Sequence, residues 1–95
     1  MYAANVNDYI CAEKHVIMDM KKRIGLALRD LRAVYRVDGH TLSQQEVADL
    51  AQISARYYHD LENGTRMPSI DVFEKVAHAF NLPLSELCKK VEEIE

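Results

Sequence analysis

Apolar residues recur three and four positions apart in several stretches of the chain, which is the spacing of one face of a helix. The first stretch predicts a helix over about residues 20–35, with a core-facing stripe of Ile24, Ala27, Leu28, Leu31 and Val34. The sequence "VDGH" that follows, residues 37–40, contains an Asp-Gly pair and predicts a turn.

Two short helices are predicted next by their capping residues. Ser43 and Glu46 have the spacing of a capping box, so one helix begins at Ser43. Ser54 is a second N-cap, and Gly64 suits the left-handed residue that ends the second helix. Helices shorter than about 12 residues are marginal in water. Both must therefore be held by packing, as in a helix-turn-helix. Buried candidates in the first short helix are Val47, Ala48, Leu50 and Ala51.

Two more helices follow. Ser69 caps a helix that ends near Asn81, and its core stripe is Ile70, Phe73, Val76, Ala77 and Phe80. Pro83 suits the first turn of the last helix, where its missing N–H costs nothing. Leu84, Leu87 and Val91 are expected to face inward there, and residues 92–95 are expected to fray. The fold class predicted is all-α, with five helices over residues 20–95.

Residues 1–19 form a predicted N-terminal extension. Apolar residues recur in it at roughly helical spacing, interrupted by Glu13, so an extra helix and a loose appendage both remain open. The apolar positions are Val6, Tyr9, Ile10, Val16 and Ile17.

Length and composition limit the class of protein. A chain of 95 residues with 48% hydrophobic residues fits one small domain. Cys11 and Cys88 lie in no metal-ligand or disulfide pattern, and the four histidines lack ligand spacing, so no metal and no cofactor are expected. The apolar runs are too short to span a membrane, and the start of the chain lacks a signal peptide. We therefore expect a soluble cytoplasmic protein.

Charge is unevenly distributed along the chain. The formal net charge is −3, but residues 21–66 carry a net charge of +2, while the segments before and after them are negative. Positive charge is therefore concentrated around the two short helices, but the excess there is only two charges.

The second short helix has two unlike faces. On a helical wheel, Ser54, Tyr58, Leu61 and Glu62 fall on one side, and Tyr57 lies on the flank. The opposite side carries the hydrogen-bonding residues Arg56, His59, Asp60 and Asn63. The first side suits the core, and the second suits solvent or a ligand.

Several motifs together resemble the Cro/phage-repressor (XRE-type) helix-turn-helix family. They are R-x-x-R in the first helix, S-Q-x-E-x-A opening the second, L-E-N-G closing the third, and P-S before the fourth, and the resemblance covers about residues 23–88. The family resemblance implies a five-helix lambda-repressor-like fold that binds DNA, usually as a dimer, and regulates transcription.

The resemblance also assigns roles to single residues. It implies contacts with base edges in the major groove by Ala55, Arg56 and Asp60. It implies contacts with the DNA backbone by Gln44, Tyr57, Asn63 and Arg66, to which we add His59 as a candidate. Arg32 and Glu62 match a pair that forms an internal salt bridge, which is a role in stability.

Four features depart from the family pattern. His59 stands in place of a small polar residue. About four extra residues lie in the turn before Ser43, around residues 36–40, which puts phosphate contacts there in doubt. Tyr58 stands in place of an aliphatic residue and implies a repacked core. Asp60 would repel a phosphate group if it tilted toward one.

The function predicted is a sequence-specific regulator of transcription that binds double-stranded DNA, acting as a repressor and as a homodimer on a palindromic operator. We expect the last helix and residues 1–19 to form the dimer face. The alternative is an antitoxin-like module that binds a partner protein and regulates its own operon. A degenerate copy that no longer binds DNA is a third reading. The sequence "HDLE" offers no activated nucleophile, so no enzyme activity is expected.

Overall fold

The computed structural model describes residues 19–94 and contains five helices in that range. These are α2 (Met20–Val34), α3 (Gln44–Ala51), α4 (Ala55–Asn63), α5 (Ile70–Ala79) and α6 (Leu84–Glu92). The apolar stripe predicted in the N-terminal extension lies outside the described residues. No helix of the described range is both long enough and apolar enough to cross a membrane.

The helix starts follow the capping residues closely. Ser43, Ser54 and Ser69 each accept a backbone N–H three residues later, at 3.0, 3.0 and 3.2 Å. At Ser43 the capping box is complete, because Glu46 Oε1 accepts the Ser43 backbone N–H at 2.8 Å. Gly64 ends α4 in the left-handed conformation with φ 75°. Pro83 lies one position earlier than predicted, as the N-cap of α6 and not within its first turn.

The predicted turn after the first helix is a small β-hairpin. Strands β1 (Arg36–Val37) and β2 (His40–Thr41) pair antiparallel, with Arg36 opposite Thr41. Asp38 and Gly39 join them with φ of 51° and 87°, the positive values that a two-residue hairpin turn needs. The all-α prediction therefore holds for the body of the domain, and the extra residues before Ser43 form this two-stranded ribbon.

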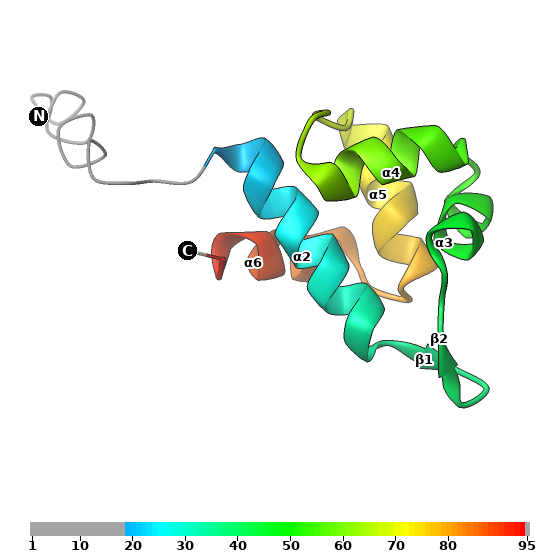
Figure 1. Ribbon diagram of the computed structural model, residues 1–95. Helices are drawn as coiled ribbons and strands as arrows, with labels where there is room; N and C mark the ends of the chain where they lie inside the picture. Colours follow the sequence, from blue (N-terminus) through cyan, green and yellow to red (C-terminus); the bar gives the residue numbers. More distant parts are fainter. Residues whose placement is uncertain (1–18, 95) are drawn as a thin grey trace, which may run out of the picture.

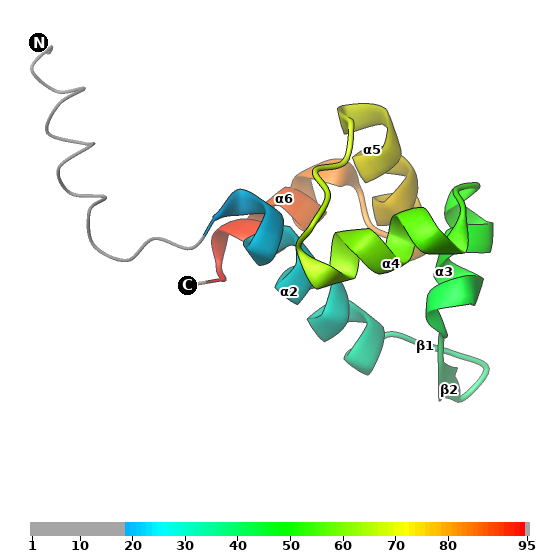
Figure 2. The same ribbon diagram turned by 45° about the horizontal axis from the view of Figure 1, so that its top comes forward.

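The helices are arranged around one core. The α2 helix packs against α4 and α6, and α3 packs against α4 and α5. Figures 1 and 2 show α3 and α4 meeting at a sharp turn at one side of the molecule, with the hairpin beside α3. The start of α2 and the end of α6 lie at the opposite side. The largest fully buried side chains are Tyr58, Phe80, Leu28, Leu61, Leu87, Val47 and Val76.

Three residues expected in the core are exposed: Val34 is 71% exposed, Leu50 58% and Ile70 70%. Each keeps helical spacing to a buried neighbour but lies roughly 70–100° from the centre of its helix's buried face, at about 100° per residue. Val34 and Ile70 are also the last and first residues of their helices, where fewer neighbours cover them. The other predicted core positions of α2, α3 and α5 are buried.

A glycine allows α2 and α4 to touch through their backbones. A Cβ atom at Gly25 would lie 2.5 Å from the Glu62 carbonyl oxygen and 2.8 Å from that of Leu61. No side chain fits there, so Gly25 sets the distance between the two helices. It thereby fixes the position of α4 relative to the rest of the domain.

Candidate nucleic-acid interface

The α3–α4 unit is a tight helix-turn-helix. The C-cap of α3 is Gln52, in the left-handed conformation with φ 61°, and the N-cap of α4, Ser54, follows two residues later. Tyr58 and Leu61 are fully buried and hold α4 against the core. Burial also raises the pKa of Tyr58 above its ordinary value, so the phenol stays neutral. With this face buried, the polar side of α4 points outward.

Glu62 is the centre of a buried polar network on the inner side of α4. Its carboxylate accepts Arg32 Nε at 2.7 Å, Arg32 Nη2 at 3.2 Å and Gln44 Nε2 at 2.9 Å. Arg32 Nη1 also donates to the Leu42 carbonyl oxygen at 3.3 Å. The two residues that the family resemblance paired therefore join α2 to α4, and Gln44 links α3 to the same carboxylate.

Opposing effects act on the Glu62 carboxyl. Its side chain is only 1% exposed, and burial raises its pKa. Hydrogen bonds from Arg32 and Gln44, together with the positive charge of Arg32, outweigh burial and hold the pKa below its ordinary value. Glu62 is therefore charged at neutral pH, and its charge is balanced by the Arg32 guanidinium.

A second set of hydrogen bonds runs along the surface from Gln44 to α2. Gln44 Oε1 lies 3.2 Å from His59 Nδ1, and His59 Nε2 lies 2.9 Å from Asn63 Nδ2. Asn63 Oδ1 accepts Arg29 Nη2 at 3.2 Å. Three of the predicted DNA-backbone residues are thus brought together, and Arg29 joins them. Sequence reasoning gave Arg29 no role, although it is the first arginine of the R-x-x-R motif.

Arg56 and Asp60 are paired on the outer side of α4. Arg56 Nε lies 3.2 Å from Asp60 Oδ1, one helical turn away. The Arg56 side chain is 82% exposed and that of Asp60 21%. Because the contact uses Nε, the terminal Nη groups of Arg56 form no hydrogen bond within residues 19–94. These are the groups that form a bidentate pair with guanine.

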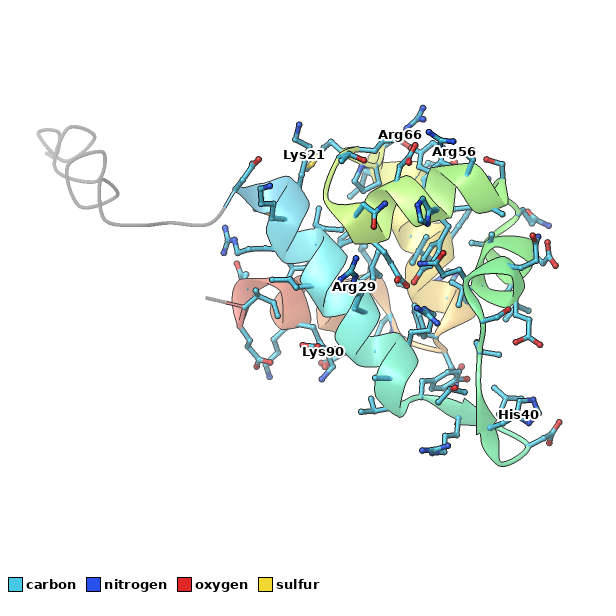
Figure 3. The ribbon with its side chains drawn as sticks, in the orientation of Figure 1. Lys21, Arg29, His40, Arg56, Arg66 and Lys90 are labelled. Atoms are coloured by element: carbon cyan, nitrogen blue, oxygen red, sulfur yellow. The ribbon has the colours of Figure 1, made fainter. Side chains whose placement is uncertain are left out.

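The remaining predicted site residues border this surface. The Arg66 guanidinium carbon lies 4.1 Å from the centre of the Tyr57 ring, a cation–π arrangement that holds both side chains beside α4. Ala55 is half-buried and can offer only its methyl group. Figure 3 shows Arg56 and Arg66 along the same edge of α4, whereas Lys90 lies on α6.

The outward side of α4 is thus a surface of hydrogen-bond donors with three arginines around it, and we call it the α4 face. It comprises Arg29, Gln44, Arg56, Tyr57, His59, Asp60, Asn63 and Arg66. Within residues 19–94, no three His, Cys, Asp or Glu side chains gather as a metal site. Such donors, held in fixed positions, suit the binding of phosphate oxygens on a polyanion.

The fold and this surface define a helix-turn-helix DNA-binding domain. The helix-turn-helix family model matches residues 35–87, more than half of the chain. The chain therefore belongs to this family, in its Cro/phage-repressor (XRE) type, and has its lambda-repressor-like fold. Members of this type are DNA-binding regulators of transcription.

Individual relatives agree with this assignment. The chain is 34% identical over 74 residues to the control protein C.MunI of a Mycoplasma species, covering 78% of this chain and 95% of that protein. It is 53% identical over 34 residues to the uncharacterized HTH-type transcriptional regulator YqaF of Bacillus subtilis, covering 36% of this chain and 45% of that protein.

Solved structures share the fold. The clp gene regulator ClgR of Corynebacterium glutamicum superposes with a TM-score of 0.67 at 24% identity, over 80% of this chain and 92% of that one. At this identity the likeness supports the fold alone.

Proposed function

We propose that this protein binds a specific sequence of double-stranded DNA through its α4 face and regulates transcription as a homodimeric repressor. The observation that carries this proposal is the pairing of an outward, donor-rich α4 face with a buried network that fixes its position. A helix held in this way can enter the major groove as a rigid element.

Contacts with base edges are assigned to the outer side of α4. The free Nη groups of Arg56 suit guanine O6 and N7, and Asp60 can accept from cytosine N4. The Arg56–Asp60 contact limits how far the arginine can swing, which favours one base position. Ala55 contributes apolar contact, for instance with a thymine methyl group.

Contacts with the DNA backbone are assigned to the border of the α4 face. Gln44 lies at the N-terminus of α3, where free N–H groups and the helix dipole favour a phosphate. Asn63 follows on the last turn of α4, and Tyr57 and Arg66 form a stacked pair beside it. Such contacts set the register of the protein on DNA without specifying sequence.

The homodimer is assigned to an apolar groove on another side of the domain. The groove has a volume of about 370 Å³ and lies between the start of α2, the start of α5 and α6. Its lining includes Met20, Ile24, Met67, Phe73 and Val91. Met67 is 54% exposed, and Ile70 beside it is 70% exposed. We assign a second copy of this chain to the groove, because a two-fold operator needs two copies and α6 is the helix expected at the dimer face.

Footprinting on the DNA upstream of the protein's own coding sequence tests the proposal. We expect protection of two half-sites whose centres lie roughly 34 Å apart, one turn of the duplex. A transcription reporter behind the same DNA should lose output when the protein is present. Equal affinity for this fragment and for unrelated duplexes would contradict sequence-specific binding, and a rise in output would contradict repression.

A further inference from the structure

One continuous chain of hydrogen bonds crosses the α4 face. It runs from Arg29 on α2 through Asn63 and His59 on α4 to Gln44 on α3, and ends at the Glu62 carboxylate. Its four contacts are 3.2, 2.9, 3.2 and 2.9 Å long. His59 is the middle member, and both of its ring nitrogens are engaged.

The charged ends fix the direction of every bond. The Arg29 guanidinium can only donate, and the Glu62 carboxylate can only accept. Asn63 therefore accepts through Oδ1 and donates through Nδ2, and Gln44 donates through Nε2 and accepts through Oε1. His59 must accept at Nε2 and donate at Nδ1, so it is neutral with its proton on Nδ1.

Among residues 19–94, the chain of bonds leaves donors without a hydrogen-bond partner at three places. Each amide nitrogen has two N–H groups, and Asn63 and Gln44 each use one of them. Arg29 also keeps unused N–H groups, because only one contact is formed by its Nη2. His59 keeps no unused nitrogen. The donors that remain for phosphate oxygens therefore belong to its neighbours.

We propose that His59 is a positioning residue for DNA binding, which orients the free donors of Gln44, Asn63 and Arg29 without itself contacting the phosphates. This proposal rests on the DNA-binding function proposed above. It replaces the expectation that His59 contacts the backbone directly, and it adds Arg29 to the residues that do.

Protonation of His59 should break the chain. A proton on Nε2 would face the Asn63 Nδ2 donor 2.9 Å away. Turning the Asn63 amide would satisfy the ring but would present a donor to Arg29. The charged groups around the ring are Arg29, reached through Asn63, and the Glu62–Arg32 pair, reached through Gln44. From α3, the group in contact with the His59 ring is the neutral side-chain amide of Gln44. Acid that places a proton on Nε2 should therefore weaken DNA binding through this residue.

Two variants separate positioning from direct contact. His59→Gln keeps one donor and one acceptor and does not titrate, whereas His59→Ala removes both. Affinity for the footprinted operator is measured by fluorescence anisotropy at pH 7.5 and pH 5.5, at one ionic strength. Chemical denaturation of each variant shows whether a change in affinity follows from a loss of folding.

The expected pattern is specific. At pH 7.5 His59→Gln should bind nearly as the wild type does, and His59→Ala should bind about 5- to 30-fold more weakly, with little loss of stability. Between pH 7.5 and 5.5 the wild type should lose several-fold more affinity than His59→Gln. A gain in affinity of the wild type over His59→Gln at pH 5.5 would overturn the proposal, because a cationic ring touching phosphate would strengthen binding. Wild-type affinity in His59→Ala at both pH values would also overturn it.

The tautomer provides a readout that does not need DNA. Nitrogen-15 NMR of the His59 ring at neutral pH should show the proton on Nδ1. A proton on Nε2 would contradict the proposed direction of the hydrogen bonds, and with it the positioning role of His59, even if the protein bound DNA specifically. A wild-type chain that binds no DNA would overturn the proposed function, and the positioning role with it, whichever tautomer is found.

Discussion

At the scale of single residues, Glu62 connects stability with the placement of the α4 face. Its carboxylate is almost fully buried, yet it receives three side-chain hydrogen bonds from α2 and α3. A charge in such a position stabilises the fold only while its partners remain, because an unpaired buried charge is costly. The pair was predictable from the motif, since R-x-x-R and L-E-N-G placed its two members.

Glu62 should make the stability of the domain depend on pH. Its pKa is below the ordinary value of 4.5, so its stabilising contribution is present above that value and is lost as the pH falls toward the folded-state pKa. Urea denaturation from pH 7 down to pH 3 should show this loss in the wild type. Glu62→Gln should be less stable at pH 7 but should lose less on acidification. Parallel pH profiles would contradict the role of Glu62.

The hydrogen-bond chain through His59 was not predictable from the sequence. His59 and Gln44 are 15 positions apart, and their contact depends on the angle between α3 and α4. Helical spacing put His59 and Asn63 on one face, but it carries no information on which side-chain conformations meet. The outward assignment of α4 was therefore available from the pattern, whereas the bonds that organise it were not.

At the scale of elements, the caps and the buried stripes specify the helices, and close backbone contact specifies how they pack. The serine caps and Gly64 were predictable from the sequence, because each residue satisfies backbone groups at the end of its own helix. Gly25 received no role from the stripe, although a glycine inside a helix is a signal of close approach. The exposure of Leu50 could not be foreseen, because spacing alone does not locate the centre of a buried face.

Gly25→Ala should destabilise the domain although alanine favours helices. Helix propensity alone would stabilise by about 1 kcal/mol. The added Cβ would overlap backbone oxygens of α4, which no side-chain rotation relieves, and overpacking typically costs about 1–3 kcal/mol. We expect a net loss in the free energy of unfolding, measured by urea denaturation.

Ala33→Gly is the matched control, at an exposed position of the same helix. It should lose about 1 kcal/mol through helix propensity alone. Replacing glycine by alanine at position 25 and alanine by glycine at position 33 should therefore both lower the stability of the domain. A Gly25→Ala variant as stable as the wild type would mean that α2 and α4 do not touch at this position.

At the scale of the whole molecule, the two proposed interfaces lie on different parts of the domain. The α4 face is formed by α2, α3 and α4, with Arg66 beyond it, and the apolar groove is formed by the start of α2, the start of α5 and α6. Arg29, Arg56 and Arg66 favour DNA on the α4 face, and the apolar lining favours a second copy in the groove. This separation allows one copy of the protein to bind DNA and a second copy of the protein at the same time.

A charge placed in the groove should dissociate the dimer. Met67→Glu should give a monomer where the wild type is a dimer, as measured by sedimentation equilibrium at micromolar concentration. Leu50→Glu is the matched control, because Leu50 on α3 is as exposed as Met67 but does not line the groove. If the Met67→Glu variant formed dimers with the same affinity as the wild type, the groove would be excluded as the dimer interface. A wild type that purifies with one equivalent of another protein would favour the antitoxin-like alternative.

The most direct test of DNA binding by the α4 face is the salt dependence of operator affinity. It is measured in two variants, one at Arg66 in the α4 face and one at Lys90 outside it. Neutralising a phosphate releases counterions, so each such contact contributes about one unit to the slope of log affinity against log salt. Arg66→Ala should lower the slope by about one, whereas Lys90→Ala on α6 should leave it unchanged. Affinity that is insensitive to salt, or an equal effect of both variants, would contradict the account.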